Sequence, residues 1–151
     1  MSATVHKLPA RFEALMLGVG DEVFAVDAAM VREILDPVPA TRVPGASEHV
    51  PAIVNVRGRI IPLADIRQRF GMDLTEPTVD TRIVVVEVEL EGDPVLVGVL
   101  ADKVYEVADL ATDTAQPVPR IGTRWRPDYV RCIARWRDDF VVVPDLARIL
   151  H

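Results

Sequence analysis

Short apolar segments separated by turn residues run along most of the chain and predict strands. The clearest pair is 53–56 (Ile-Val-Asn-Val) and 60–63 (Ile-Ile-Pro-Leu), with Arg57-Gly58 between them. Residues branched at Cβ favour strands, and glycine adopts the positive φ that a two-residue hairpin turn requires. This stretch therefore predicts a β-hairpin with its tip at Arg57-Gly58.

A capped helix is predicted directly after this hairpin. Asp65 stands where a helix N-cap is expected, and Gln68 follows at the position that completes a capping box. A carboxylate at the N-cap accepts hydrogen bonds from the free N–H groups of the first helical turn. We expect the helix to bury Ile66, the stem of Arg69, and Phe70.

The second half of the chain repeats the pattern of the first. Residues 104–107 match residues 31–34 as V-x-E-[IV], and residues 133–150 align without gaps on residues 53–70. Two charged residues recur in this alignment, Arg57 as Arg137 and Asp65 as Asp145. A repeat of this length suits two related lobes and is too long for a solenoid.

The predicted fold is all-β with short helices. Strands separated by Gly, Pro or Asp turns favour two small β-barrels. We expect the lobe-forming repeats at about 11–71 and 82–150, within a single domain at 11–151 that follows a flexible tail at 1–10. The predicted strands outside the hairpin are 11–19, 22–27, 31–35, 82–88, 95–99 and 104–107, and 37–51 is a proline-rich connector.

Composition and charge narrow the function classes. The chain has 151 residues and a formal net charge of −6 at pH 7. An acidic chain is poorly suited to nucleic acid, which is bound through clustered lysines and arginines. The N-terminus lacks the apolar core of a secretory signal, and no apolar run is long enough to span a bilayer. The sequence therefore predicts a soluble cytoplasmic protein with no nucleic-acid partner and no direct membrane insertion.

No group of residues has the spacing of a catalytic or metal site. His6, His49 and His151 are far apart, and the single cysteine, Cys132, lies in an apolar segment and is expected to pack in the core. Residues 113–115 (Asp-Thr-Ala) resemble the D-T-[GSA] of aspartic proteases, but they lie in a polar segment instead of between apolar strands. We therefore expect no enzyme activity, no metal and no cofactor, and binding is the default function.

Glu33 and Arg57 are the first candidates for a binding surface. Glu33 alternates with apolar residues, and Arg57 lies at the predicted hairpin tip. One interpretation is a solvated ion pair that contributes at most about 1 kcal/mol to stability. The other is a charged pair beside apolar Val31, Ile34 and Ile60 on a surface that faces a partner. Spacing alone leaves both interpretations open.

The two tryptophans form a second signal. Trp125 lies between two arginines in a proline-rich loop, which is the composition of an interface hot spot. It can equally cover one end of a barrel. Trp136 belongs to the repeated strand pattern and is expected to pack inside.

The motifs together resemble a known family. The matching segments are 31–34 (Val-Arg-Glu-Ile), 55–58 (Asn-Val-Arg-Gly), 61–67 (Ile-Pro-Leu-Ala-Asp-Ile-Arg) and 97–107, which contains the pattern G-x-x-x-D-x-V-x-E-V. With them the chain resembles the CheW family of chemotaxis coupling proteins over about residues 11–150. The N-x-R-G string followed by proline and D-[LI]-R at this spacing is specific, whereas V-x-E-[IV] alone is not.

This resemblance implies both a fold and a function. The implied fold is two five-stranded, SH3-like barrels that are interlocked by exchanged elements. The implied function is that of a non-enzymatic adaptor, which bridges the cytoplasmic tip of a chemoreceptor to the regulatory domain of a CheA-type histidine kinase. The kinase domain has the same fold, and the receptor helix is expected in an apolar groove between the lobes. The adaptor would then be cytoplasmic and recruited to membrane-associated receptor arrays.

The resemblance also implies site residues. By motif match, four residues are expected on the partner-facing surface, and two second-lobe residues are candidates for the groove wall. The surface residues are Val31, Glu33, Arg57 and Gly58, and the groove residues are Val99 and Val104.

Some positions depart from the family pattern. The family usually has a glycine where Ala52 stands and another near Cys132, so both substitutions add a side chain where the family leaves room beside the backbone. Pro144 and the Trp125 loop are further departures. They motivate an alternative in which the chain is a related scaffold that serves a pilus, gliding or polar-localisation system.

Overall fold

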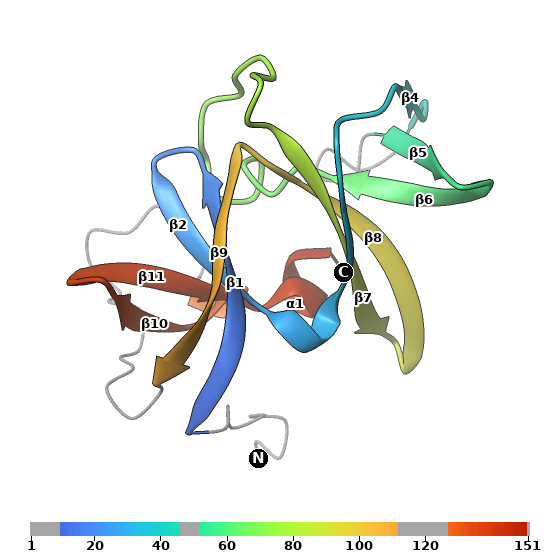
Figure 1. Cartoon of the computed structure of the whole chain (residues 1–151). Coiled ribbons are helices and arrows are strands. Elements are labelled where there is room, and N and C mark those ends of the chain that lie inside the picture. Colours follow the sequence, from blue (N-terminus) through green and yellow to red (C-terminus); the bar gives the residue numbers. More distant parts are fainter. Residues whose placement is uncertain (1–9, 46–51, 112–126, 151) are drawn as a thin grey trace.

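Strands make up most of the chain in the computed structural model, which describes residues 10–45, 52–111 and 127–150 (Figure 1). The strands are β1 (Arg11–Val19), β2 (Glu22–Asp27), β3 (Val31–Leu35), β4 (Ala40–Arg42), β5 (Ala52–Val56), β6 (Arg59–Ala64), β7 (Arg82–Leu90), β8 (Asp93–Ala101), β9 (Lys103–Ala111), β10 (Val130–Trp136) and β11 (Asp139–Pro144). The described part also contains the short helix α1 (Leu146–Leu150) and single 3₁₀ turns at Ala28–Met30 and Pro127–Tyr129.

The strands form two sheets. Sheet A has five strands in the order β10-β11-β2-β1-β9, and sheet B has six in the order β3-β7-β8-β6-β5-β4. The all-β prediction with two small β-lobes is confirmed. The additional strand of sheet B is β4, which lies in the segment that was expected to be only a proline-rich connector.

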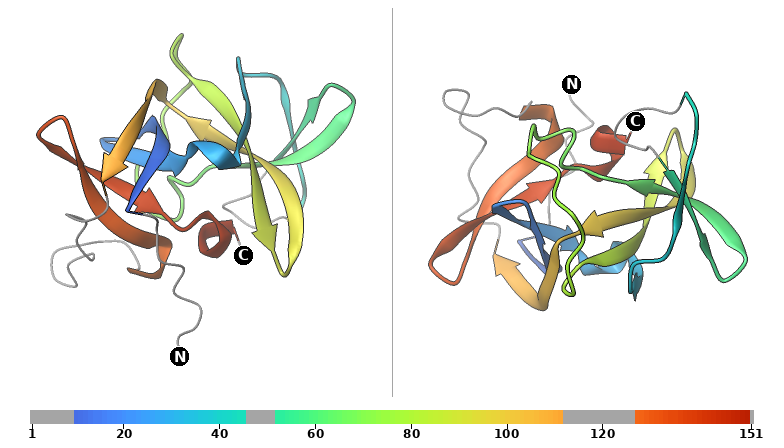
Figure 2. Two further views of the ribbon diagram at one scale, coloured as in Figure 1. Left: turned by 60° about the horizontal axis from the view of Figure 1, so that its bottom comes forward. Right: turned by 90° about the horizontal axis from the view of Figure 1, so that it is seen from above.

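Each sheet takes strands from both halves of the chain. Sheet A combines β1 and β2 with β9, β10 and β11, and sheet B combines β3 to β6 with β7 and β8. The exchange is made by β3, which pairs with β7, and by β9, which pairs with β1. Figure 2 shows the blue β1–β2 hairpin beside the orange β9 and the red β10–β11 hairpin. The interlocked arrangement that the resemblance implied is present.

The two sheets also follow one plan. From β9 onwards sheet A has the order β9-β1-β2-β11-β10, and sheet B has the order β3-β7-β8-β6-β5 before β4. Leu17 of β1 pairs with Val104 of β9, and Val86 of β7 pairs with Val31 of β3. Each sheet has a parallel pairing at the equivalent place, between β11 and β2 and between β6 and β8. This correspondence is the one that an internal duplication produces.

Clusters of buried apolar side chains join the strands. The central cluster takes residues from both sheets, including Leu17, Phe24 and Val86. Ile66 and Phe70, which were predicted to be buried, belong to it, and the rings of Phe70 and Phe24 meet edge to face with centroids 5.0 Å apart. Smaller clusters belong to the individual sheets. Because the central cluster is shared, neither sheet has a complete core without the other.

The two departures from glycine lie inside strands, not in turns. Ala52 pairs with Leu63 across β5 and β6, and Cys132 pairs with Val143 across β10 and β11. Both residues are buried, as predicted for Cys132. Burial raises the pKa of the Cys132 thiol, which keeps the sulfur protonated and unreactive. Cys132 stands at a shift in the register of β10 against β11, which falls between Val130 and Cys132.

The predicted hairpin turn is present. Arg57 and Gly58 have φ angles of 53° and 84°, which is the left-handed conformation of a two-residue primed turn. The side chain of Asn55 accepts a hydrogen bond from the Gly58 N–H at 2.8 Å and so closes the turn. At the counterpart tip between β10 and β11, Arg137 and Asp138 adopt φ angles of 52° and 63° without a glycine.

The predicted helix after the first hairpin is wrong. Residues 66–71 form successive turns, and the Gln68 N–H donates to the backbone carbonyl of Asp65. The Asp65 carboxylate does accept from a backbone N–H of this first turn, that of Arg67, as predicted, and it also accepts from the Arg67 guanidinium. In the second copy the capping prediction is confirmed, because Asp145 accepts from the Arg148 N–H at the start of α1.

The shared core generates a stability prediction. Replacing Phe70 by alanine removes a ring from the central cluster and should lower the free energy of unfolding by about 3–5 kcal/mol. Phe140→Ala is the matched control, since that ring is 56% exposed and its loss should change stability by about 0.5 kcal/mol. Urea unfolding of both variants measures the difference. Equal destabilisation would contradict the assignment of Phe70 to the shared core.

A cluster of carboxylates at the β1–β2 turn generates a pH prediction. Burial raises the pKa of Glu22, and the neighbouring Asp21 and Asp139 raise it further. Because folding disfavours the charged form, stability falls as the pH rises from the ordinary value of 4.5 through the raised one. Glu22→Gln should therefore raise the free energy of unfolding at neutral pH and change it little at about pH 4. The exposed Asp93→Asn is the control in urea unfolding at both pH values, and an equal effect of Glu22→Gln at both would contradict the prediction.

Candidate functional site

An ion pair joins the first hairpin tip to strand β3. Arg57 Nη2 lies 2.6 Å from Glu33 Oε1. The register of β3 against β7 shifts between Val31 and Glu33. The Arg57 side chain is 80% exposed and that of Glu33 is 23% exposed, so a well-anchored carboxylate holds a guanidinium that faces solvent. The structure thus brings together the two charged residues that the sequence singled out.

Exposed apolar side chains accompany this pair. Ile34 directly follows Glu33, and Ile60 lies just beyond the turn on β6 with 60% of its surface exposed. A Cβ added at Gly58 would meet no atom within 4 Å, so the tip is open to solvent. Charged and apolar groups exposed together are typical of contact surfaces. We call Glu33, Ile34, Arg57, Gly58 and Ile60 the Glu33–Arg57 surface.

Sheet A has a second ion pair at the counterpart positions. Arg137 Nη2 lies 2.5 Å from Glu106 Oε1, and the repeat aligns these two residues with Arg57 and Glu33. The exposed isoleucines also have exposed apolar counterparts. We call Glu106, Val107, Arg137 and Phe140 the Glu106–Arg137 surface. Sequence analysis aligned the two repeats but missed this pair, although the V-x-E and hairpin repeats together contained the signal.

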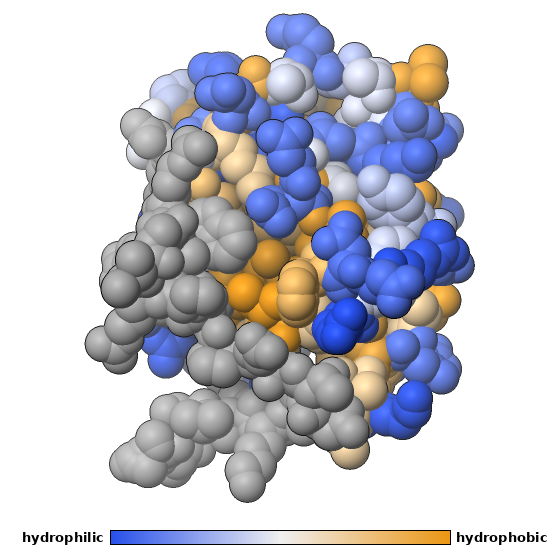
Figure 3. All heavy atoms as spheres, turned by 90° about the vertical axis from the view of Figure 1, so that its left-hand side faces the viewer, coloured by the Kyte–Doolittle hydropathy of each residue, from blue (hydrophilic) through white to orange (hydrophobic). Residues whose placement is uncertain are grey.

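The second surface is aromatic where the first is aliphatic. The rings of Tyr105 and Trp136 meet at an angle of 60° with centroids 5.8 Å apart, and the Arg137 guanidinium lies 4.8 Å from the Trp136 centroid. With Phe140 they line a hollow of about 250 Å³. Trp136 is thus half-buried at the surface, not packed inside as expected. On the side of the molecule where the β10–β11 hairpin lies, apolar residues gather near the centre, with polar ones above them and to their right (Figure 3).

The three valines named by the sequence lie apart from the exposed surfaces. Val99 is 1% exposed and belongs to the central cluster. Val31 and Val104 are half-buried against that cluster at equivalent positions of β3 and β9. Val99 therefore offers no side-chain surface, whereas Val31 and Val104 each offer part of theirs.

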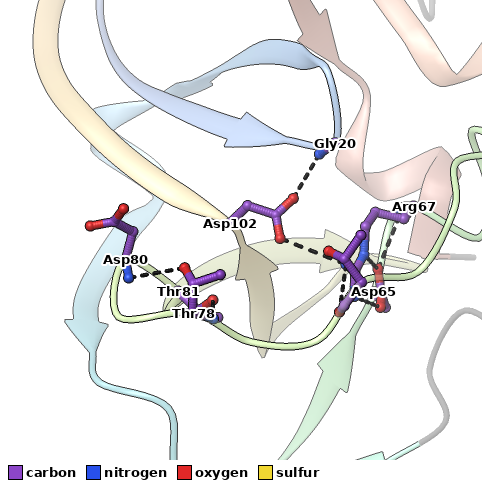
Figure 4. Close-up of polar contacts among 8 residues, drawn as sticks. Gly20, Asp65, Arg67, Thr78, Asp80, Thr81 and Asp102 are labelled. Atoms are coloured by element: carbon purple, nitrogen blue, oxygen red, sulfur yellow. Dashed lines mark hydrogen bonds and ion pairs between the residues drawn. The ribbon is translucent and has the colours of Figure 1, made fainter.

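A buried arginine connects the two sheets, and sequence analysis missed it. Arg67 donates to Asp65 at 2.8 Å from Nε and 2.6 Å from Nη2, and its Nη1 lies 3.6 Å from Asp102 Oδ1 (Figure 4). The bond to Asp65 raises the pKa of Arg67 further, so the guanidinium stays charged despite burial. Nη1 also donates to Thr75, and Asp102 accepts from the Gly20 N–H. We call Gly20, Asp65, Arg67, Thr75 and Asp102 the Arg67 junction.

Some residues of the sequence analysis belong to the undescribed segments of the chain. His6, His49, His151, Trp125 and residues 113–115 lie outside the described residues. Within the described ranges, no three His, Cys, Asp or Glu side chains are grouped to hold a metal ion. The same part of the chain contains no helix long and apolar enough to cross a membrane.

Comparison with known proteins identifies the family. The family described as CheW-like domain matches residues 13–151. Chemotaxis protein CheW of Rhizobium meliloti (strain 1021) is 34% identical over 134 residues, which cover 89% of this chain and 81% of that protein. Protein PilI of Pseudomonas aeruginosa is 28% identical over 127 residues, which cover 80% of this chain and 69% of that protein.

A solved structure agrees with this assignment. The crystal structure of the scaffolding protein TtCheW from Thermoanaerobacter tengcongensis superposes with a TM-score of 0.79 at 28% sequence identity and covers 91% of each chain. The fold, the motifs and the extent of these matches all point to one family. The chain belongs to the CheW-like family of chemotaxis scaffold proteins, and it is therefore an adaptor and not an enzyme.

Proposed function

We propose that the chain couples the cytoplasmic tip of a chemoreceptor to the regulatory domain of a CheA-type histidine kinase. The adaptor would act in the cytoplasm, at membrane-associated receptor arrays. The Glu33–Arg57 ion pair is the observation that supports this proposal most directly, because it lies at the surface on two of the motifs that resemble the family. The match of the family over residues 13–151 supports the general role.

The Glu33–Arg57 surface is the proposed contact for the kinase domain. Glu33 holds the Arg57 guanidinium in one place, which lowers the entropy lost when a partner binds. The exposed guanidinium can select a partner of complementary charge, and Ile34 and Ile60 provide apolar area around it. Gly58 permits the left-handed turn that presents Arg57.

The valines have supporting roles in this proposal. Val31 anchors the strand that presents Glu33, because it packs on the central cluster. Val104 is proposed to contribute its exposed part to a groove for the receptor helix between the lobes. Val99 is buried, so it can support the groove only by packing against the residues that form the groove wall.

The Glu106–Arg137 surface gives the adaptor a second contact. An adaptor must bind two neighbours at once, and this surface repeats the charged pair of the first on the other sheet. Its aromatic side chains differ from the aliphatic ones of the first surface, so the two surfaces suit different partners. We propose that it binds a second barrel of the same fold.

Arg57→Ala tests the first contact. The fold should persist, because the exposed side chain contributes little to the core, and the affinity for the kinase regulatory domain should fall about tenfold or more. Isothermal titration calorimetry measures affinity, and thermal unfolding measures the fold. Arg59→Ala is the matched control on the same hairpin and should leave the affinity unchanged. Unfolding of the Arg57→Ala variant, or unchanged affinity, would show that Arg57 is not the contact.

Arg137→Ala separates the two surfaces. This variant should keep its binary affinity for the domain that the Glu33–Arg57 surface binds, and it should fail to form larger assemblies with that domain, because one of its two contacts is lost. Analytical ultracentrifugation of the mixture distinguishes binary from larger complexes. Larger assemblies of normal size would rule out a bridging role for the Glu106–Arg137 surface.

A related scaffold that serves a pilus, gliding or polar-localisation system is the alternative, and one of the relatives, Protein PilI, is not named for chemotaxis. The departures at Ala52, Cys132 and Pro144 do not favour it, since all three residues are buried and change no contact surface. Affinity purification from the native cell discriminates the two proposals. Recovery of pilus components without a CheA-type kinase would favour the alternative.

A further inference from the structure

The two hairpin tips present their arginines in the same way but on opposite sides of the molecule. Arg57 and Arg137 have φ angles of 53° and 52°, and each guanidinium is paired with the equivalent glutamate, Glu33 or Glu106. Figure 2 shows the green β5–β6 hairpin and the red β10–β11 hairpin projecting on opposite sides. A partner face that recognises one tip therefore finds a similar arginine on the other.

The residues that follow each arginine differ in charge. Gly58 and Arg59 occupy these two positions in the first tip, and Asp138 and Asp139 occupy them in the second, where both are exposed. Asp138 has a φ of 63°, a left-handed conformation that glycine adopts more readily than aspartate does. The Phe140 N–H donates to Asp139 Oδ1 at 2.8 Å, which holds that carboxylate at the tip. The first tip is thus basic, whereas the second is acidic.

The β1–β2 turn adds negative charge beside the second tip. Burial raises the pKa of Glu22, and repulsion from Asp21 and Asp139 raises it further, so these three carboxylates lie near one another. Counted along the paired strands, Pro94 and Val95 are the equivalents of Asp21 and Glu22 in sheet B. The first tip therefore has no carboxylates at these positions.

The negative charge of the second tip is not neutralised by ion pairs. Within the described residues, neither Asp138 nor Asp139 forms an ion pair. The nearby cations lie over aromatic rings, Arg135 at 5.8 Å from the Phe140 centroid and Lys103 at 5.2 Å from that of Tyr105. An anionic group that approaches the second tip therefore meets two unpaired carboxylates next to the arginine.

We propose that Asp138 and Asp139 keep the partner of the Glu33–Arg57 surface off the Glu106–Arg137 surface. The inference rests on the proposed function, in which the Arg57 guanidinium selects a face of complementary, negative charge on the kinase regulatory domain. On the second surface, the same face would find Arg137 at the equivalent position with two carboxylates beside it. Repulsion between like charges prevents this wrong contact.

The apolar side chains alone separate the two surfaces less well. Val107 is the counterpart of Ile34, and Phe140 is the counterpart of Ile60, so exposed apolar area accompanies the arginine on both surfaces. An apolar surface accepts another apolar group of similar size at small cost, whereas a repelled charge excludes a wrong partner. The two aspartates are therefore the element that directs partners of related fold to different surfaces.

Spectra of the ¹⁵N-labelled kinase regulatory domain test the inference with full-length adaptor variants. The signals that shift with the Arg137→Ala adaptor define the face of the domain that binds the Glu33–Arg57 surface. With the Arg57→Ala adaptor, half-saturation of these signals should need at least about a tenfold higher concentration. Adding Asp138→Gly and Asp139→Asn to Arg57→Ala should lower it again about tenfold, because this face can then bind at Arg137.

Two controls show whether the restored binding is local. Adding Arg137→Ala as well should abolish the restored shifts. Asp73→Asn with Glu76→Gln makes the same change of net charge in the exposed linker and, in the Arg57→Ala adaptor, should restore nothing. No restoration by the two tip substitutions, or restoration by the linker substitutions, would overturn the inference alone. If the Arg137→Ala adaptor shifts no signals at all, the proposed function fails and the inference fails with it.

Asp138→Gly alone separates a role in partner selection from a role in folding. Glycine adopts the left-handed φ of this turn freely, so the melting temperature of the adaptor should be equal or higher. A lower melting temperature would overturn the inference, because Asp138 would then be required by the turn itself.

Discussion

The exchange of strands between the two halves is the constraint on which the rest of the structure depends. Each half supplies a hairpin whose outer strand has no partner within the same half. The other half supplies that partner strand, so that β9 pairs with β1 and β3 pairs with β7. The backbone groups of an unpaired strand edge are costly when buried, so this pairing is required before either sheet can close. The shared central cluster adds the apolar burial that fixes the two sheets together.

The two repeats differ mainly at positions that take no part in the strand exchange or the shared core. The strands keep apolar residues at equivalent positions, but the surfaces at the hairpin tips have become aliphatic in one copy and aromatic in the other. Both hairpin tips keep an arginine that pairs with a glutamate of the edge strand, β3 in one sheet and β9 in the other. The position of each tip relative to its edge strand is therefore the same in the two repeats. The clearest internal difference is the buried one, Arg67 against Ala147.

Much of this could be predicted from local sequence. The hairpin at Arg57-Gly58 was predictable because a two-residue primed turn needs residues that tolerate positive φ. The capping by Asp65 was predictable as well, but the segment after it forms successive turns instead of a helix. The two side-chain hydrogen bonds from Arg67 to Asp65 were not predictable, because no capping pattern includes them. The Glu106–Arg137 pair was missed since its members lie 31 residues apart and meet only through the pairing of β9 with β1 and β10 with β11.

The strand exchange also determines how the protein can be made. While the first half leaves the ribosome, β1 and β2 have neither β9 nor β11 to pair with, because those strands are translated last. Long-range pairings of this kind make folding slow, since distant parts of the chain must meet before hydrogen bonds and burial compensate for the lost entropy. Until β9 and β11 have been synthesised, the edges of the β1–β2 hairpin therefore lack the strands that cover them in the folded protein. For the same reason, neither repeat alone contains all the strands of either sheet.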